Sequence, residues 1–307
     1  MSAAIREERR RIETAHLMGA GGLETVGRLT HMVDMVIETL ALRADAGYDA
    51  GQGQYVLVAE GGYGRREMCP ASDVDVMLLF KDEDVGLAQL SAYIFHMLVD
   101  LGFELGYSYR AIPDALTLAE GDFKSLSSLL DARPLETSNQ QIFTEFQQQF
   151  AALLTQERVA SFVEWRLAER ERRHREQAGR SGEPNTKEGR GGLRDFHDVM
   201  WILRVTTGGV GLAGLEASGV LTKAECAQCL AVFDFLLRVR NQQHFGFGKC
   251  DVLSVDQRRT VAYGLGFPDE RRFMERYTHS TRELRHLSSL ALRRLLDRGH
   301  GDLSERG

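Results

Sequence analysis

Apolar residues recur at helical spacing over most of the chain, and two short segments depart from this pattern. Within residues 4–46, one helical face carries the apolar positions Leu29, Met32, Val33, Val36 and Leu40. This spacing predicts an amphipathic helix that packs on a neighbouring element. Residues 55–59 form an apolar run rich in β-forming residues, and residues 74–80 form a second strand-like run that is apolar except at Asp75. Such short runs predict two strands of a sheet.

The pattern returns to helix after the second strand and then to strand once more. Residues 87–102 have amphipathic spacing and end at Gly102, which predicts a helix, and residues 103–110 then predict a third strand. Residues 138–177 predict one or two helices, and the chain after residues 183–195 reads as wholly helical. The densely charged segment 169–177 shows no apolar face, so we expect it to be solvated. This order predicts an α+β fold.

Two domains follow from this order of elements. We divide the chain into a first domain at 1–155, which holds the strands, and a wholly helical second domain at 156–307. The glycine-containing loop 178–182 is another candidate for the boundary.

Composition narrows the class of protein. The chain has 307 residues and a net charge of −6, which gives no reason to expect a nucleic-acid partner. It has no apolar run long enough to span a membrane, and its charged N-terminus is not a signal peptide, so we expect a cytoplasmic protein. Cys226 and Cys229 lie at helical spacing without a second pair of ligands, which favours helix packing over a zinc site.

The candidate chemistry lies between the first two strands. Gly61 and Gly62 permit tight backbone geometry directly after the first strand. Asp73 and Asp75 are two residues apart, so in a strand both carboxylates point to the same face. Paired carboxylates together with phosphate oxygens are the ligands that Mg²⁺ prefers. The combination indicates metal-dependent chemistry on a nucleotide, against the alternative of an ordinary turn beside a solvated strand edge.

A second glycine-rich segment precedes a helix that begins near Leu193. Gly191 and Gly192 stand at the helix N-terminus, where free N–H groups favour an anion, and Lys187 and Arg190 add positive charge. The alternative is a flexible linker capped by a helix.

Both segments resemble one family. The sequence GGYGRREMCPASDVDVMLLF (61–80) is similar to the signature of polymerase-β-like nucleotidyltransferases, in the form found in protein-PII uridylyltransferases. The sequence EPNTKEGRGGLRD (183–195) resembles the second signature of that family. The resemblance implies a small mixed β-sheet nucleotidyltransferase domain followed by an all-α helical-bundle domain. Arg66 departs from the family's glycine, and Met68 from its leucine.

The resemblance also implies roles for individual residues. The expected catalytic and metal-binding carboxylates are Asp73, Asp75 and Glu104. Glu104 is equally an exposed strand position, with Asp100 and Asp122 as rivals. The expected nucleotide-binding residues are Gly61, Gly62, Arg65, Ser72, Arg110, Lys187, Arg190, Gly191 and Gly192. His244 and Arg240 either contact the nucleotide or pack within the fold.

The function implied by the resemblance is a Mg²⁺-dependent transfer of UMP from UTP to a tyrosine hydroxyl of the PII nitrogen-regulatory protein, with release of pyrophosphate. Two alternatives stay open: adenylyl transfer from ATP to another protein, and a nucleotide-binding regulatory module without turnover. The resemblance covers about residues 25–295, and we find neither the HD phosphohydrolase domain nor the ACT domains of the family's longer members. We therefore expect attachment only, without a response to glutamine.

Overall fold

The structure is a computed structural model in which the chain divides into two compact units. The described residues are 1–47, 54–82, 85–136, 139–178 and 182–304. The first unit comprises residues 1–14 and 26–155, and the second comprises 15–25 and 156–307. Residues 15–25 thus group with the second unit, although they precede residue 155. Residues 179–181 of the other candidate boundary lie outside the described residues.

The N-terminal region forms two helices, α1 (Ser2–Leu17) and α2 (Gly22–Gly47). The apolar stripe expected within residues 4–46 lies on α2, and all five of its members are buried. The amphipathic spacing therefore gave the correct buried face.

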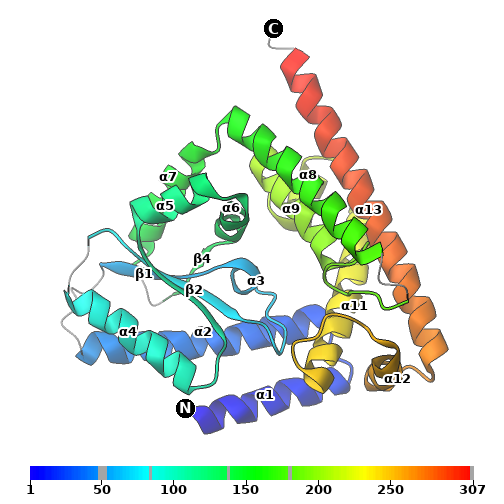
Figure 1. Ribbon diagram of the computed structural model, residues 1–307, viewed down its shortest axis with the longest axis horizontal. Coiled ribbons are helices and arrows are strands. Elements are labelled where there is room, and N and C mark those ends of the chain that lie inside the picture. Colours follow the sequence, from blue (N-terminus) through cyan, green and yellow to red (C-terminus); the bar gives the residue numbers. More distant parts are fainter. Residues whose placement is uncertain (48–53, 83–84, 137–138, 179–181, 305–307) are drawn as a thin grey trace. The chain divides into compact units, whose positions relative to one another are not determined.

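The first unit is built on a four-stranded sheet with the order β3-β2-β1-β4 (Figure 1). Its strands are β1 (Tyr55–Ala59), β2 (Val74–Phe80), β3 (Leu105–Ala111) and β4 (Arg133–Pro134). β2 pairs antiparallel with β1 and parallel with β3, so the sheet is mixed, as expected. Every residue of β1 is buried, which explains why its sequence is a continuous apolar run.

Within its described residues, the first unit has five further helices. They are α3 (Gly61–Gly64), α4 (Val85–Asp100), α5 (Ile112–Gly121), α6 (Phe123–Leu130) and α7 (Gln140–Leu153). α4 is the crossover that joins the parallel strands β2 and β3. Asp122 caps α6 by accepting a hydrogen bond from the backbone N–H of Ser125 at 2.8 Å. Asp122, one of the two alternatives to Glu104 as the third carboxylate, therefore has a structural role as a helix cap.

The described part of the second unit is helical, which confirms the predicted α+β class. Its helices are α8 (Gln156–Ala178), α9 (Leu193–Thr207), α10 (Gly211–Ala217), α11 (Lys223–Phe247), α12 (Val255–Gly264) and α13 (Glu270–Ser304). Apolar residues of α8, α9, α10, α11 and α13 share one core. Cys226 and Cys229 are both buried on α11, so the packing interpretation of this pair is confirmed.

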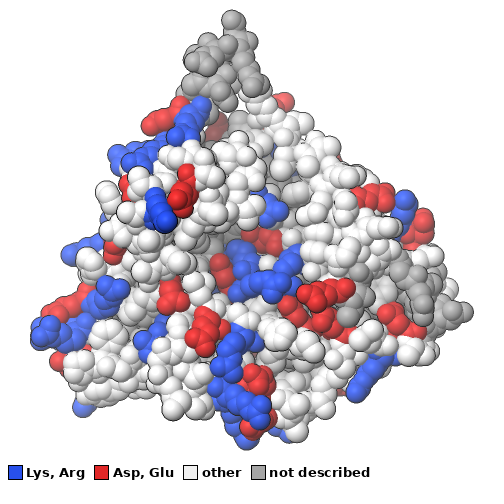
Figure 2. All heavy atoms as spheres, turned by 180° about the vertical axis from the view of Figure 1, so that it is seen from behind, with Lys and Arg blue, Asp and Glu red and all other residues white. Residues whose placement is uncertain are grey.

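The helices were compared with what a membrane span requires, and the charged side chains were followed over one face of the surface. No helix within the described residues is both long enough and apolar enough to cross a membrane. On the face drawn in Figure 2, basic and acidic side chains are interspersed rather than gathered by sign.

Candidate functional site

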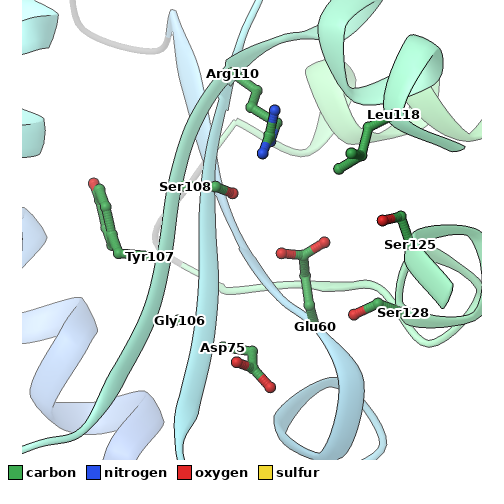
Figure 3. A pocket seen from close by; sticks show the side chains of 9 residues that line it. All are labelled: Glu60, Asp75, Gly106, Tyr107, Ser108, Arg110, Leu118, Ser125 and Ser128. Carbon is green, nitrogen blue, oxygen red and sulfur yellow. The ribbon is translucent and has the colours of Figure 1, made fainter. Parts of the chain in front are cut away.

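A pocket of about 310 Å³ lies in the first unit, where β1, β2 and β3 face α5 and α6 (Figure 3). Its lining residues are Glu60, Asp75, Gly106, Tyr107, Ser108, Arg110, Leu118, Ser125 and Ser128. We call it the Asp75 pocket. Carboxylates, a guanidinium and hydroxyl groups meet there beside one apolar side chain, a combination suited to a charged and hydrogen-bonding ligand.

Two glycines make room for the Asp75 carboxylate. Asp75 pairs with Gly106 across the parallel strands β2 and β3. A Cβ atom on Gly106 would lie 2.2 Å from Asp75 Oδ1, and one on Gly61 would lie 3.3 Å from Asp75 Oδ2. A side chain at position 106 would therefore displace the carboxylate. The sequence indicated Gly61 but gave no signal for Gly106.

The structure does not gather the three expected metal ligands into the pocket. Asp75 lines it, whereas Asp73 precedes β2 and is not among the lining residues. Glu104 is exposed, and its carbonyl oxygen accepts a hydrogen bond from the N–H of Val74 at 2.8 Å. Within the described residues, no group of three acidic, histidine or cysteine side chains is placed to hold a metal. The roles of Asp73 and Glu104 stay predictions.

Glu60 is a pocket residue that the sequence analysis missed. It directly follows β1, and its backbone N–H donates to the carbonyl oxygen of Asp75 at 2.9 Å. Burial, and then the neighbouring Asp75 carboxylate, raise the pKa of Glu60 to about 7, while Arg110 opposes the shift. An acidic residue at the end of a buried strand, directly before glycines, was the available signal.

Arg110 lines the pocket, as expected for a nucleotide-binding residue, but Arg65 points elsewhere. The buried Arg65 side chain pairs with Glu67 at 3.0 Å and with Asp131 at 2.5 Å. Two carboxylates thus neutralise its charge, and the pair with Asp131 joins α3 to the end of α6. Arg65 therefore positions the turn, and its contact with phosphate stays a prediction.

The turn after α3 contains a strained residue. Among the described residues, Arg66 is the one non-glycine residue with positive φ, at 62°. This left-handed conformation is one that glycine adopts without steric cost. Arg66 thus replaces the family's glycine at a position whose backbone conformation favours glycine.

Ser72 closes the next turn, because its Oγ accepts a hydrogen bond from the N–H of Cys69 at 3.1 Å.

The second glycine-rich segment is held by bonds within the second unit. Asn185 Oδ1 accepts hydrogen bonds from the N–H groups of Lys187 and Glu188, at 3.0 and 2.7 Å. Gly192 N–H donates to the carbonyl of Gly189, at the start of α9. The next two N–H groups donate to carbonyls of residues 186 and 187. The donors that an anion would use at this helix terminus therefore have partners inside the chain.

Packing explains the glycine at position 191. Gly191 has φ of 72°, and a Cβ atom there would lie 1.8 Å from the carbonyl oxygen of Thr281 on α13. Its N–H donates to Asp195 Oδ2 at 2.8 Å.

The two basic residues of this segment differ in exposure: Lys187 is half-buried and Arg190 is exposed. Burial, Arg240 and Arg194 lower the pKa of Lys187.

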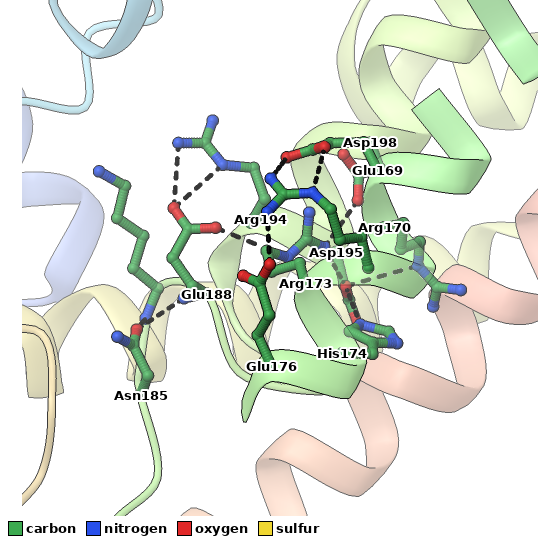
Figure 4. Close-up of polar contacts among 12 residues, drawn as sticks. Glu169, Arg170, Arg173, His174, Glu176, Asn185, Glu188, Arg194, Asp195 and Asp198 are labelled. Atoms are coloured by element: carbon green, nitrogen blue, oxygen red, sulfur yellow. Dashed lines mark hydrogen bonds and ion pairs between the residues drawn. The ribbon is translucent and has the colours of Figure 1, made fainter. Parts of the chain in front are cut away.

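The expectation that residues 169–177 are solvated is wrong for three of them, whereas Glu171, Arg172, Arg175 and Glu176 are exposed as expected. Arg170, Arg173 and His174 are buried and face the acidic residues of α9 (Figure 4). Arg173 Nη2 lies 2.6 Å from Asp195 Oδ1 and 2.8 Å from Asp198 Oδ2, and His174 Nε2 lies 2.7 Å from Asp195 Oδ1. The charges pair across two helices, so their burial is compensated. Single-helix periodicity carries no information about such pairing.

A smaller buried group accounts for His244 and Arg240. His244 Nε2 lies 3.0 Å from Asp251 Oδ1, and Arg240 Nε lies 2.6 Å from the same atom. Both partners lower the pKa of Asp251 below its ordinary value. These contacts favour the packing alternative for the two residues.

Two family models match the chain. Residues 161–292 match the GlnD PII-uridylyltransferase model, and residues 9–108 match the putative nucleotidyltransferase DUF294 model. The two matched ranges fall one on each side of residue 155.

Curated relatives extend over most of the chain. A bifunctional uridylyltransferase/uridylyl-removing enzyme of Phenylobacterium zucineum is 33% identical over 84% of this chain and 29% of the relative. The protein of the same name from Bradyrhizobium diazoefficiens is 31% identical over 90% of this chain and 31% of the relative. That of Rhodopseudomonas palustris is 29% identical over 97% of this chain and 34% of the relative. The chain therefore spans about a third of the length of these relatives.

Proposed function

We propose that this chain, which belongs to the family of PII uridylyltransferases, is a nucleotidyltransferase that moves UMP from UTP to a tyrosine hydroxyl of a PII-type protein. The two sequence signatures predicted membership of this family, and the family models and the relatives confirm that prediction. The chain spans only about a third of the length of these relatives, so the nucleotide donor, the acceptor protein and the metal are stated for this chain as proposals.

The Asp75 pocket is the observation that carries the proposal. It holds carboxylate groups next to a guanidinium, together with three serine hydroxyls. Transfer of a nucleotidyl group depends mainly on positioning the phosphates and stabilising their charge. Arg110 supplies positive charge for phosphate oxygens, and Ser125 and Ser128 supply donors from α6.

The pocket suits Mg²⁺ as the accompanying cation. Carboxylate oxygens are hard ligands, and Mg²⁺ is held in such sites by one or two carboxylates plus phosphate oxygens and waters. A site of this kind needs no cluster of three protein ligands. Bound there, Mg²⁺ would offset phosphate charge and lower the pKa of the attacking hydroxyl.

The protein's own residues then prepare the transfer. The absence of side chains at Gly61 and Gly106 leaves room for the Asp75 carboxylate in the pocket. Arg110 binds the phosphate oxygens that gain charge as pyrophosphate leaves. The acceptor hydroxyl attacks the α-phosphorus, the bond to the β-phosphate oxygen breaks, and the hydroxyl proton is released.

Label transfer tests the proposal. The full chain is incubated with Mg²⁺, a PII protein, and either labelled UTP or labelled ATP. We expect label on PII from UTP and a loss of at least about 100-fold for Asp75→Asn, since a charge-stabilising group is removed. Asp82→Asn is the matched control, because Asp82 is an exposed acid two residues after the end of β2.

Each alternative has its own outcome. Label from ATP alone would replace uridylyl by adenylyl transfer. No label from either nucleotide, or equal label with Asp75→Asn, would contradict the catalytic proposal.

A further inference from the structure

The outer strand of the sheet lines the pocket and has an open edge. β3 is the last strand in the sheet order and pairs with β2 residue by residue over its full length of seven. Among the described residues, no strand pairs with its other side. None of the residues of β3 is buried, whereas every residue of β1 is. β3 is therefore an edge strand that is accessible along its length.

The backbone of this edge offers hydrogen-bonding groups to another chain. The N–H of Val74 donates to the carbonyl of Glu104, which sets the phase of the parallel pairing. In this phase, the N–H and C=O groups of Leu105 and Tyr107 point away from β2, toward the open side. Within the described residues, these backbone groups make no hydrogen bond. Such an edge is a template for the addition of a strand.

β3 also lacks the features that usually protect an edge strand. Those features are proline, lysine, a bulge or a very short strand. The sequence of β3 is LGYSYRA, and its charged residue, Arg110, lines the pocket. An unprotected edge of this length would favour aggregation unless it served as a binding surface.

Gly106 leaves the way open from this edge to the Asp75 carboxylate. Gly106 is exposed, and a Cβ atom there would lie 2.2 Å from Asp75 Oδ1, so no side chain stands between the edge and the carboxylate. On an added strand, the residue opposite Gly106 would direct its side chain to the pocket face of the sheet. Its Cβ would lie two strand spacings from Asp75, about 9–10 Å, and a tyrosine side chain covers most of this distance. A glycine within a strand often marks such a close approach.

The opposite face of β3 carries an apolar shelf, formed by Phe95, Val99 and Tyr107. Figure 3 draws the Tyr107 side chain on the side of β3 away from the pocket. Its ring packs against Phe95 of α4, with ring centroids 5.5 Å apart. Phe95 and Val99 are neighbours on one face of α4 and are 37% and 48% exposed. On an added strand, the two side chains next to the one at Gly106 would lie on this shelf.

We propose that the open edge of β3 docks the acceptor protein, by pairing antiparallel with an extended segment that carries the tyrosine to be modified. The proposal rests on the proposed function and adds how the acceptor is recognised. The tyrosine lies opposite Gly106 and enters the Asp75 pocket. Its two neighbours lie opposite Leu105 and Tyr107 and are apolar. The continuity of the edge with the pocket selects this occupant, because the reacting hydroxyl must reach the pocket on a protein chain.

Binding of a synthetic heptapeptide tests the edge without nucleotide or metal. The peptide has a central tyrosine between two valines and a fluorescent label, and fluorescence anisotropy follows its binding to the full chain. In the antiparallel pair, the valine N–H groups bond to β3, whereas the tyrosine N–H points away. N-methylation of both valines should therefore weaken binding at least about 5-fold. N-methylation of the tyrosine is the matched control and should weaken it less than about 2-fold.

Two substitutions at Leu105 test the same bond from the side of the protein. Leu105 is the first residue of β3, a position where proline is tolerated, and its N–H faces the open edge. Leu105→Pro removes this donor, while Leu105→Ala shortens the side chain and keeps the donor. We expect Leu105→Pro to bind the peptide at least about 5-fold more weakly than Leu105→Ala, and to transfer correspondingly less label to the acceptor. Circular dichroism checks that both variants keep the fold.

A substitution on α4 tests the apolar shelf. Val99→Ser should weaken binding of the peptide with valines but not of a peptide with serines in their place, since the lost contact is apolar. Val85→Ser is the matched control, because Val85 is an exposed valine at the other end of α4. It should leave the binding of both peptides unchanged.

The outcomes separate docking from the transferase. Equal binding of the two methylated peptides, equal binding by Leu105→Pro and Leu105→Ala, or no binding at all would overturn the docking edge. A wild-type dimer in sedimentation that Leu105→Pro dissociates would assign the edge to a second copy of the chain instead. Edge-dependent binding by a chain that transfers no label would uphold docking and refute the transferase. Label transfer that is equal in Leu105→Pro and Leu105→Ala would do the reverse.

Discussion

Replacing Arg66 by glycine should stabilise the first unit, although it removes a charged side chain. Arg66 has φ of 62°, and the left-handed region costs an L-residue about 1–2 kcal/mol. Glycine removes this strain, but it also raises the conformational entropy of the unfolded chain, which lowers the free energy of unfolding by about 0.5–1 kcal/mol. The ion pair with Asp34 spans 3.9 Å, and the Arg66 side chain is 58% exposed, so its loss costs at most about 0.5 kcal/mol.

Comparison of glycine with alanine isolates the backbone contribution. Arg66→Ala loses the same ion pair but keeps the strain, so Arg66→Gly should be the more stable variant by about 0.5–1 kcal/mol. Arg43 is the matched control, because it is an exposed arginine with helical backbone in α2 of the same unit. There the order should reverse, with glycine about 1 kcal/mol less stable than alanine.

Urea unfolding measures these differences. The two tryptophans, Trp165 and Trp201, both belong to the second unit, so their fluorescence reports on that unit. Far-ultraviolet circular dichroism is therefore needed to follow the first unit. With a slope of about 2 kcal/mol per molar urea, the Arg66 pair should differ in midpoint by about 0.3–0.5 M. If Arg66→Ala equals or exceeds Arg66→Gly in stability, the argument from backbone strain is refuted.

Two further predictions concern the pocket and the second unit. Gly106→Ala should lower label transfer at least about 100-fold with the fold retained, because its Cβ would displace the Asp75 carboxylate. Gly121→Ala, where a Cβ meets open space, is its control, and equal loss in both variants would contradict this reasoning. His16 is fully buried, and burial lowers its pKa to about 4, so the unfolded chain binds the extra proton. Its contribution to stability is therefore present above about pH 6.5 and should fall by roughly 3 kcal/mol toward pH 4. His16→Gln should lack this component in urea unfolding at a series of pH values, and an unchanged pH dependence would refute the assignment.

The sequence was informative wherever one segment alone determines the structure. Apolar spacing in α2 and the apolar runs of β1 and β2 identified the buried faces, because burial of these elements follows from their own periodicity. The two signatures likewise located the turn near Asp75 and the loop before α9. The all-helical second unit followed from the same reasoning.

Predictions failed or stayed incomplete where two segments must meet. Arg173 and His174 were expected in solvent because residues 169–177 show no apolar face, yet the acidic groups that compensate their burial lie on α9. The resemblance assigned Arg65 to phosphate, and the sequence gave no sign of its pairing with Asp131, which lies 66 positions away. An ion pair between two helices leaves no periodic pattern in the sequence of either helix, so periodicity does not predict it.

The Asp75 pocket shows the same limit in the identity of its acidic groups. A D-x-D pair predicts two carboxylates on one face of one strand, and so directs attention to Asp73. Side chains that face each other across a sheet, however, come from different strands, and register decides which ones meet. The antiparallel register of β1 and β2 brings Glu60 to Asp75, whereas the parallel register of β2 and β3 brings Gly106. The carboxylate that faces Asp75 across the sheet is therefore decided by strand pairing, which the pattern of neither strand contains.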